Sequence, residues 1–370
     1  MAPSAVARRA GRQTAPIAAV TWRDGVHLTG TPIWCDARRR RDVCFVSSAD
    51  RVGRAGHHQL IGSPLTLALL GARGGGHLGV PLHRRFTLGT VRLELVASGR
   101  GPGAAALHVD HDGKRVLYAG AVRPLRGPRA GEAIEVAEVR TSHAVVVAAP
   151  YGAEHQRFPP LGDAIAQTLD WVRAQLATAR RPVLFVDTAL DGLEVAACLH
   201  AAGIALSGAR AIRDLARRAG ELAGTGVTIE EHSNPARAVR DRYPISGTAI
   251  SSLASRSGEL VITSPGREPR AVVWLDSDRG GLARALADRP FATALVSGRA
   301  LEGRGTCDAA FAWANAADRE QLLEWIEATS AREVFVTGAF AEAIAGVLGP
   351  RARIIGPPHQ MTLFPREAAR

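Results

Sequence analysis

The stretch Ala97–Ala121, with the sequence ASGRGPGAAALHVDHDGKRVLYAGA, narrows the fold more than any other part of the chain. A glycine-rich turn leads into an apolar strand, and a second strand ends at Gly120 and Ala121. The tight turn between the two strands, His111–Lys114, contains Asp-Gly, which is a strong signal for a β-hairpin. The stretch therefore predicts a glycine-rich turn followed by a hairpin whose second strand ends in small residues.

Length and composition predict a soluble globular protein without a membrane-spanning segment. The chain has 370 residues, enough for one large domain or two medium ones, and 46% of them are hydrophobic and 22% charged. No apolar run approaches the roughly 18 residues that span a bilayer. The four cysteines are scattered without a Cys-x-x-Cys pair, so we expect neither a zinc ribbon nor a disulfide framework, and a cytoplasmic location fits.

The charge of the chain is strongly positive. The formal net charge is +11, and Lys114 is the only lysine among the 46 basic residues. This arginine excess, with abundant Ala and Gly, indicates a high-GC coding bias and weakens the inference from charge to function. A net charge this positive still favours polyanions such as DNA or RNA. Residues 1–17 contain no acidic residue and are expected to form a disordered basic tail; a transit peptide is the alternative.

Periodicity places further elements on both sides of the hairpin. Four consecutive arginines, Arg38–Arg41, form a turn before a buried strand at Val43–Val46. A short helix is predicted over Leu60–Leu70, with Ser63-Pro64 near its start. Further along the chain, the pattern predicts an amphipathic helix and then alternating strands and helices: Leu161–Arg180, Val183–Val186, Leu193–Ala202, Ala211–Leu222, Ala271–Leu275, Phe291–Ser297, Arg319–Thr329, Glu333–Thr337 and Phe340–Leu348.

Four segments follow one another in the order of a known family. They are the glycine-turn hairpin, Pro150-Tyr-Gly152 after an apolar strand, Ser297-Gly-Arg299, and Val336-Thr-Gly338. On these segments the chain resembles the metallo-β-lactamase fold, and within it the β-CASP nucleases, over roughly residues 20–355. It is most similar to the bacterial ligase-associated DNA exonuclease group, which resembles the mRNA 3′-end processing nucleases.

The resemblance implies an α/β fold with a defined division of the chain. The core is an αββα metallo-β-lactamase sandwich, and a β-CASP-like α/β domain is inserted into it. The first part of the sandwich is expected at residues 18–190 and the insertion at residues 191–295. The return segment of the sandwich and the C-terminal tail are expected at residues 296–370.

The resemblance also implies where a metal site stands in the family and what has replaced it here. The family uses two zinc ions, held by about six or seven His and Asp ligands, to activate a water against a phosphodiester. Its main motif, His-x-His-x-Asp-His, falls in the loop Ser47–Gly56, where either of two registers gives at most one usable ligand. The corresponding positions are Ser48, Asp50, Arg51, Arg100, Ala121, Ala316 and Gly338. Among them only Asp50 has a metal-binding side chain, so no metal cofactor is expected.

Arg51 and Arg100 are candidate phosphate-binding residues. Two guanidinium groups in a former metal pocket could replace the charge of the ions and hold a phosphate. They could instead pair with Asp50, or simply fill and neutralise the pocket. The sequence leaves these alternatives open.

The expected function is that of a catalytically degenerate homologue of a zinc-dependent DNA or RNA exonuclease. It would be a nucleic-acid-binding or scaffolding subunit in DNA repair or RNA processing, without enzymatic activity. Its partners would be DNA or RNA, and an active nuclease paralogue or a ligase or helicase repair complex, without a membrane. A subunit that binds only protein is a further alternative.

Two other interpretations remain open. One is an active metal-dependent hydrolase or exonuclease with a rearranged zinc site, for which His57, His58 and Asp50 are the candidates. The other is an unrelated α/β protein. The segment His108–Asp112 resembles a metal motif, but it is better explained as a solvated hairpin, because alternate residues of a strand point to opposite faces.

Overall fold

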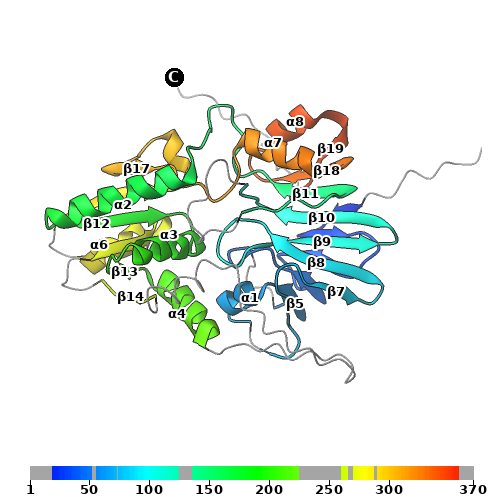
Figure 1. Cartoon of the computed structure of the whole chain (residues 1–370), viewed down its shortest axis with the longest axis horizontal. Helices are drawn as coiled ribbons and strands as arrows, with labels where there is room; N and C mark the ends of the chain where they lie inside the picture. Colours follow the sequence, from blue (N-terminus) through cyan, green and yellow to red (C-terminus); the bar gives the residue numbers. More distant parts are fainter. Residues whose placement is uncertain are drawn as a thin grey trace, which may run out of the picture.

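The chain folds as an α/β protein with two units that lie side by side (Figure 1). The computed structural model describes seven segments of the chain: residues 19–51, 56–72, 74–124, 136–224, 260–265, 270–286 and 290–357. The expected tail at residues 1–17 lies outside them. One unit contains two sheets, called A and B, and the other contains a third sheet, called C.

Sheet A has six strands in chain order. Its first three strands are antiparallel, and the pairs from β3 to β6 are parallel. The strands are β1 (Val20–Trp22), β2 (Val26–Leu28), β3 (Ile33–Cys35), β4 (Val43–Phe45), β5 (Gln59–Gly62) and β6 (Leu78–Gly79). The prediction of one helix over Leu60–Leu70 is wrong for its first residues: Leu60 and Ile61 pair with β4, and helix α1 (Pro64–Leu70) begins only after the Ser63 cap.

Sheet B has seven strands in the order β19-β18-β11-β10-β9-β8-β7. The predicted hairpin is confirmed, because β9 and β10 pair antiparallel with Lys114 opposite His111. The strands from β10 to β19 pair in parallel. The bounds are β7 (Arg85–Leu88), β8 (Val91–Ala97), β9 (Ala105–His111), β10 (Lys114–Gly120), β11 (Ala144–Ala148), β18 (Glu333–Thr337) and β19 (Ala352–Ile354).

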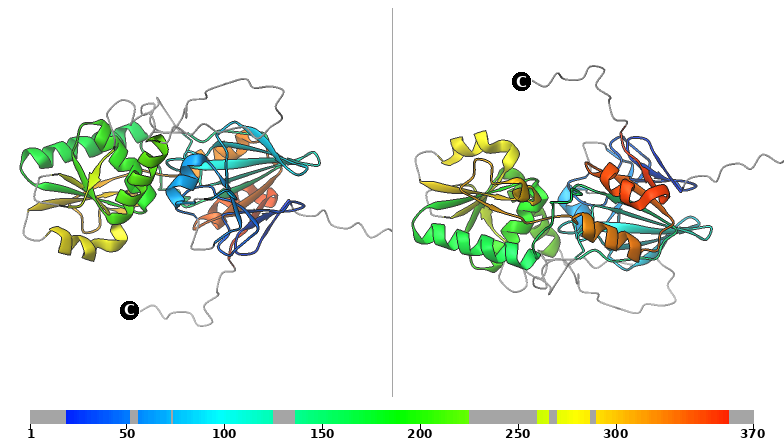
Figure 2. Two further views of the ribbon diagram at one scale, coloured as in Figure 1. Left: turned by 90° about the horizontal axis from the view of Figure 1, so that it is seen from below. Right: turned by 90° about the horizontal axis from the view of Figure 1, so that it is seen from above.

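Sheets A and B pack face to face and are flanked by helices. Phe45 of sheet A and Leu107 of sheet B belong to one buried cluster between them. The other face of sheet B packs Val145 against Trp325 of α7 (Arg319–Ala328) and also packs against α8 (Ala341–Leu348). On the outer face of sheet A, α1 contributes Leu67 to a smaller cluster. Sheets A and B thus form two packed layers, with α7 and α8 against the other face of sheet B (Figures 1 and 2).

Sheet C is built from parallel pairs in the order β14-β13-β15-β12-β16-β17. Every residue of β12 is buried, as expected for a parallel strand covered on both faces. Helix α6 lies on the opposite face of this sheet from α2 and α3 (Figure 2). The elements are α2 (Leu161–Ala177), β12 (Arg181–Val186), α3 (Ala189–Ala201), β13 (Leu206–Gly208), α4 (Arg210–Gly224), β14 (Ile262–Thr263), β15 (Ala271–Leu275), η1 (Asp276–Asp278), α6 (Arg279–Leu286), β16 (Phe291–Val296), η2 (Gly298–Glu302) and β17 (Ala309–Phe311); η3 (Gly349–Arg351) follows α8.

The second unit is larger than the residues 191–295 expected from the sequence. Sheet C begins at Arg181 and ends at Phe311, so the expected boundaries cut through it. Helix α2 also belongs to this unit, because Trp171 packs edge-to-face on Phe311. The physical reason is strand pairing: β12 lies in the middle of sheet C and pairs with β15 on one side and with β16 on the other.

None of the helices in the described segments has the length and apolar composition of a membrane span.

Candidate functional site at the interface between the units

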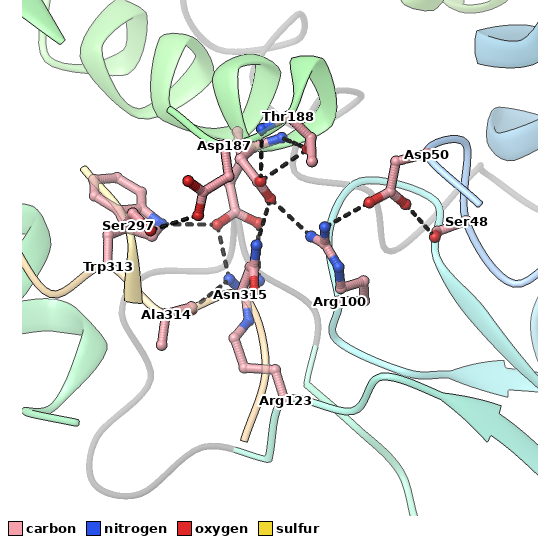
Figure 3. A network of polar contacts seen from close by, with 12 residues as sticks. Ser48, Asp50, Arg100, Arg123, Asp187, Thr188, Ser297, Trp313, Ala314 and Asn315 are labelled. Carbon is pink, nitrogen blue, oxygen red and sulfur yellow. Dashed lines mark hydrogen bonds and ion pairs between the residues drawn. The ribbon is translucent and has the colours of Figure 1, made fainter. Parts of the chain in front are cut away.

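The positions selected from the sequence come together at one edge of the two-sheet unit. Strands β8, β10, β11 and β18 all run in one direction, so their carboxyl ends share an edge of sheet B. Arg100 follows β8, Ala121 follows β10 and Gly338 follows β18. Sheet A joins this edge where the amide of Ala105 donates to the carbonyl of Ser47, just after β4. This edge faces the second unit, as the contacts of Arg100 show (Figure 3).

Small residues fill part of this edge. Ala121, Ala148 and Ala316 form a buried cluster with Tyr151, and Phe158 packs against it. At Gly338 the backbone has φ +102, and an added Cβ would lie 2.8 Å from the carbonyl oxygen of Ala149. A side chain of any kind at residue 338 would therefore require the backbone to move. The cluster and this glycine leave no polar side chain at Ala121, Ala316 or Gly338.

Arg100 occupies the centre of the edge and pairs with two carboxylates. Its Nη2 lies 2.6 Å from Oδ2 of Asp50, and its Nη1 lies 2.7 Å from Oδ1 of Asp191 (Figure 3). The three side chains are 7%, 14% and 11% exposed, in that order, so the whole arrangement is shielded from water. Ser48 donates its hydroxyl to Asp50. Of the alternatives left open by the sequence, the pairing of Arg100 with Asp50 is the one found.

The electrostatics of this trio follow from burial and neighbouring charge. Burial alone would raise the pKa of Asp50, but the Arg100 guanidinium and the Ser48 hydroxyl outweigh it and hold the pKa below its usual range. Burial likewise opposes the charge on Arg100, and Asp191 and Asp50 reverse this and raise its pKa. Asp50 and Arg100 are therefore charged together at neutral pH. Both terminal nitrogens of Arg100 are engaged by the protein itself.

A second buried arginine lies next to the first. Arg123 follows β10 and binds Glu194 through both terminal nitrogens, each at 2.8 Å from a carboxylate oxygen. The indole Nε1 of Trp313 donates to the same carboxylate at 2.9 Å. Burial acts to raise the pKa of Glu194, and Arg123 lowers it below its usual range. Fork-to-fork geometry of this kind is the strongest form of an arginine–carboxylate pair.

Both arginines reach from the two-sheet unit to helix α3 of the other unit. Asp191 and Glu194 lie three residues apart, so they share one side of α3. Asp191 also forms a capping box with Thr188 and accepts a hydrogen bond from the side-chain Nδ2 of Asn315. The sequence analysis missed this group, although an acidic pair inside an otherwise apolar helix is a recognisable signal. A buried carboxylate requires a cationic partner from elsewhere in the fold.

Arg51 and Asp36 complete the edge on the side of sheet A. Arg51 is exposed, and its charge acts to lower the pKa values of Asp36 and Asp50. Asp36, which the sequence analysis also missed, accepts hydrogen bonds from the Ser47 amide, the Ser47 hydroxyl and the Tyr118 hydroxyl. Burial raises the pKa of Asp36 despite these donors. Of the two arginines proposed to hold phosphate, only Arg51 faces solvent.

This edge adjoins a pocket in which Arg123 is the one charged residue of the described lining. The pocket has a volume of about 100 Å³, with Arg123, Phe158, Ala316 and Gln321 in its wall. Among the residues that the structure describes, no group of three or more His, Cys, Asp and Glu side chains is placed to hold a metal ion. His57 accepts a hydrogen bond from the Arg41 amide, and it forms no metal-binding group with His58 and Asp50.

Comparison with known proteins adds no identification. No protein-family model matches the chain. No curated protein matches it at a significant level either.

Proposed function

We propose that this chain is a catalytically inactive protein of the metallo-β-lactamase fold with a β-CASP-like second unit, and that it acts as a nucleic-acid-binding scaffold. The two packed sheets of the first unit, with α7 and α8 against sheet B, support the sandwich. The strands of parallel sheet C lie between β11 and β18 in the chain, which supports the inserted unit. Ser48, Asp50 and Arg100 are linked by hydrogen bonds, and Ala121 and Ala316 share a buried cluster, which supports a common former site.

The observation that carries the inactive assignment is the position of Arg100. Its guanidinium is paired on both sides with carboxylates, and under the proposed fold it stands in place of the family's metal ions. A fixed cation repels a metal ion, and it also removes Asp50 as a ligand. Alanines at residues 121 and 316 and a glycine at residue 338 supply no replacement.

The same geometry assigns Arg100 and Arg123 a structural role. Each crosses from the two-sheet unit to α3, and both are buried. Breaking such a pair costs about 3–5 kcal/mol, so the two arginines hold the units in one fixed arrangement. Arg100 is buried and its charge is already matched by Asp50 and Asp191, so it attracts a phosphate only weakly. Nucleic acid would therefore bind outside the former metal site, attracted by the net charge of +11.

The partners and location follow from this role. We propose DNA or RNA as the ligand, and an active nuclease paralogue or a ligase or helicase repair complex as the protein partner. A cytoplasmic setting fits four cysteines that are all free in the structure.

The proposal is tested on the purified full chain by metal content, cleavage and binding. We expect no stoichiometric zinc by elemental analysis, and no cleavage of a fluorescent 20-nucleotide DNA or RNA with added Zn²⁺ or Mn²⁺. The same oligonucleotides should bind, with an affinity that falls linearly on a log–log plot against salt concentration. About two zinc ions per chain with cleavage would instead establish the active hydrolase. A chain that binds no oligonucleotide at low salt would leave the protein-binding scaffold as the function.

A further inference from the structure

The turn of four arginines, Arg38–Arg41, takes no part in the ion pairs that join the two units. It lies in the segment between β3 and β4, and its members Arg38, Arg39 and Arg40 are all exposed. The fourth member, Arg41, is half-buried. The proposed function does not use these residues, although they are the densest run of positive charge among the described residues.

The backbone of this turn is firmly held. The amide of Asp36 donates to the carbonyl of Phe45, and the Asp36 carboxylate binds Ser47 and Tyr118. Ala37 is fully buried, and the amide of Arg38 donates to the carbonyl of Asp24 at 2.7 Å. Next to it, an added Cβ on Gly25 would lie 2.6 Å from the Ala37 Cα, so only glycine permits this contact. The three exposed arginines therefore extend from a fixed base.

Arg41 differs from its neighbours because the protein uses it internally. Its guanidinium lies 3.7 Å from the ring centre of Trp34, and its Nη2 donates to the carbonyl of Arg23 at 2.6 Å. Its amide donates to His57. On the same indole, His27 stacks with its ring centre 4.6 Å away. Arg41 thus anchors the far end of the turn and leaves the first three arginines to solvent.

The local charge is positive. Over residues 23–42, Arg23 and the four arginines of the turn give +5, and Asp24, Asp36 and Asp42 give −3, for a net charge of +2. Arg39 pairs with Asp24 at 3.0 Å. Neither Arg38 nor Arg40 has a carboxylate within ion-pair distance in the described part of the chain.

Several exposed arginines elsewhere do have such partners, although Arg92 and Arg332 have none in the described part of the chain. Arg173 pairs with Asp170, Arg217 with Glu221 and Arg353 with Glu333. The turn is therefore a surface where charge is presented rather than neutralised. A carboxylate partner would be simple to supply on an exposed turn, and here two of three positions lack one.

We infer that this turn, Arg38–Arg40, is the surface on which the backbone of a nucleic acid docks. The inference rests on the proposed function and names the site of its ligand. Guanidinium groups bind phosphate oxygens in bidentate fashion, and a nucleic acid supplies phosphates at regular intervals. The net charge of +2 over residues 23–42, on a fixed base, complements that polyanion. Every contact formed releases a counterion.

The experiment compares two triple variants that remove the same charge. Arg38→Gln/Arg39→Gln/Arg40→Gln is the test, and Arg173→Gln/Arg217→Gln/Arg353→Gln is the control. Binding of fluorescent 20-nucleotide single-stranded DNA, RNA and duplex DNA is followed by anisotropy across a series of KCl concentrations. We expect the test variant to bind about tenfold or more weakly. Its log–log salt slope should be shallower by about 2 to 3, because about three phosphate contacts are lost.

The control variant should keep a binding constant within about threefold of the wild type, since its arginines are already paired. Equal losses in both variants, or no loss in the test variant, would overturn the docking surface and leave the proposed function intact. A wild-type chain that binds none of the oligonucleotides would overturn both. The double variant Arg38→Gln/Arg40→Gln spares the Arg39–Asp24 pair, so it repeats the test if the triple variant is unstable.

Discussion

The buried arginines at the interface between the units contrast with the exposed arginines of the turn after β3. Arg100 and Arg123 are 6% and 4% exposed, and each is matched to carboxylates of α3. Arg38 and Arg40 are exposed and have no such partners in the described chain. One residue type therefore serves two opposite purposes in the same molecule.

The difference shows that a positive net charge does not by itself create a phosphate-binding site. A guanidinium can be buried only with its charge matched, because the interior solvates ions poorly. Once a carboxylate neutralises its charge, the guanidinium stabilises the contact between the units but attracts a phosphate only weakly. An exposed guanidinium keeps water as its solvent and exchanges it for phosphate at small cost. Burial and partners thus decide which arginines of a +11 chain can bind a polyanion.

The largest loss of stability should follow from removing Arg123, because this breaks the buried ion pair with Glu194. Arg123→Met leaves the 7%-exposed side chain of Glu194 without its cation. We expect the free energy of unfolding to fall by about 3–5 kcal/mol, because an unpaired charge remains buried. Guanidinium chloride unfolding, followed by tryptophan fluorescence, measures the loss.

The matched control removes both charges together. Arg123→Met/Glu194→Leu should recover most of the stability, although Trp313 then loses its acceptor at a cost of about 1 kcal/mol. A single variant that loses less than about 1 kcal/mol would show that the pair is solvated. The interface would then not differ from the exposed turn.

A smaller effect, with a pH signature, is expected from Arg100→Met. In the folded wild-type chain, burial acts to raise the pKa of Asp50, but Arg100 outweighs burial and holds the pKa below the ordinary value of 3.8. The stability from this group is therefore present above pH 4 and is lost as the pH falls through the lowered pKa. Without Arg100, burial dominates and raises the pKa, so protonation relieves the penalty. We expect a loss of about 3 kcal/mol at pH 7 that shrinks towards pH 3.

Urea unfolding at a series of pH values measures this difference. The double variant Asp50→Asn/Arg100→Met lacks the Asp50 carboxylate, so titration of residue 50 should not change its own free energy of unfolding. Its deficit relative to the wild type should shrink on acidification only because the wild-type chain loses the contribution of Asp50. A deficit for Arg100→Met that stays constant from pH 7 to pH 3 would contradict a charge-based role for Arg100. Packing of its side chain would then account for the effect.

The smallest effect is expected from Arg299→Gln. Arg299, like Arg100, pairs with two aspartates, so the two arginines differ mainly in their exposure. Arg299 pairs with Asp187 and, at 2.9 Å, with Asp276, but its side chain is 47% exposed. Solvent screens such a pair, so Arg299→Gln should cost under about 1 kcal/mol. Thermal unfolding in low salt and in about 0.5 M salt measures the cost, which salt should largely remove. A loss equal to that of Arg100→Met would show that burial is not what separates the two arginines.

Local patterns in the sequence predicted a large part of the architecture. The hairpin of β9 and β10, helix α2 and helix α7 are confirmed close to their predicted bounds, because each has a clear apolar period and a turn or cap signal. The division of residues 59–70 into β5 and α1 was not predicted. Leu60 and Ile61 suit a helix as well as a strand, and only their pairing with β4 decides between the two.

The candidate site shows the same limit. The sequence selected Asp50 and Arg100 and left open whether they would meet. It missed Asp191 and Glu194, which lie about 90 and 70 residues from their arginine partners. No local pattern encodes contacts at such separations, since they depend on how the two units pack.

By itself, the sequence determined the hairpin and the main helices and strands. These features depend on residue type and short spacing. Only the tertiary structure decided that Arg100 and Arg123 are enclosed with carboxylates of α3, while Arg38–Arg40 remain in solvent. The reason is that an arginine is the same cation everywhere in a sequence, and its surroundings in the fold determine whether its charge is neutralised or available.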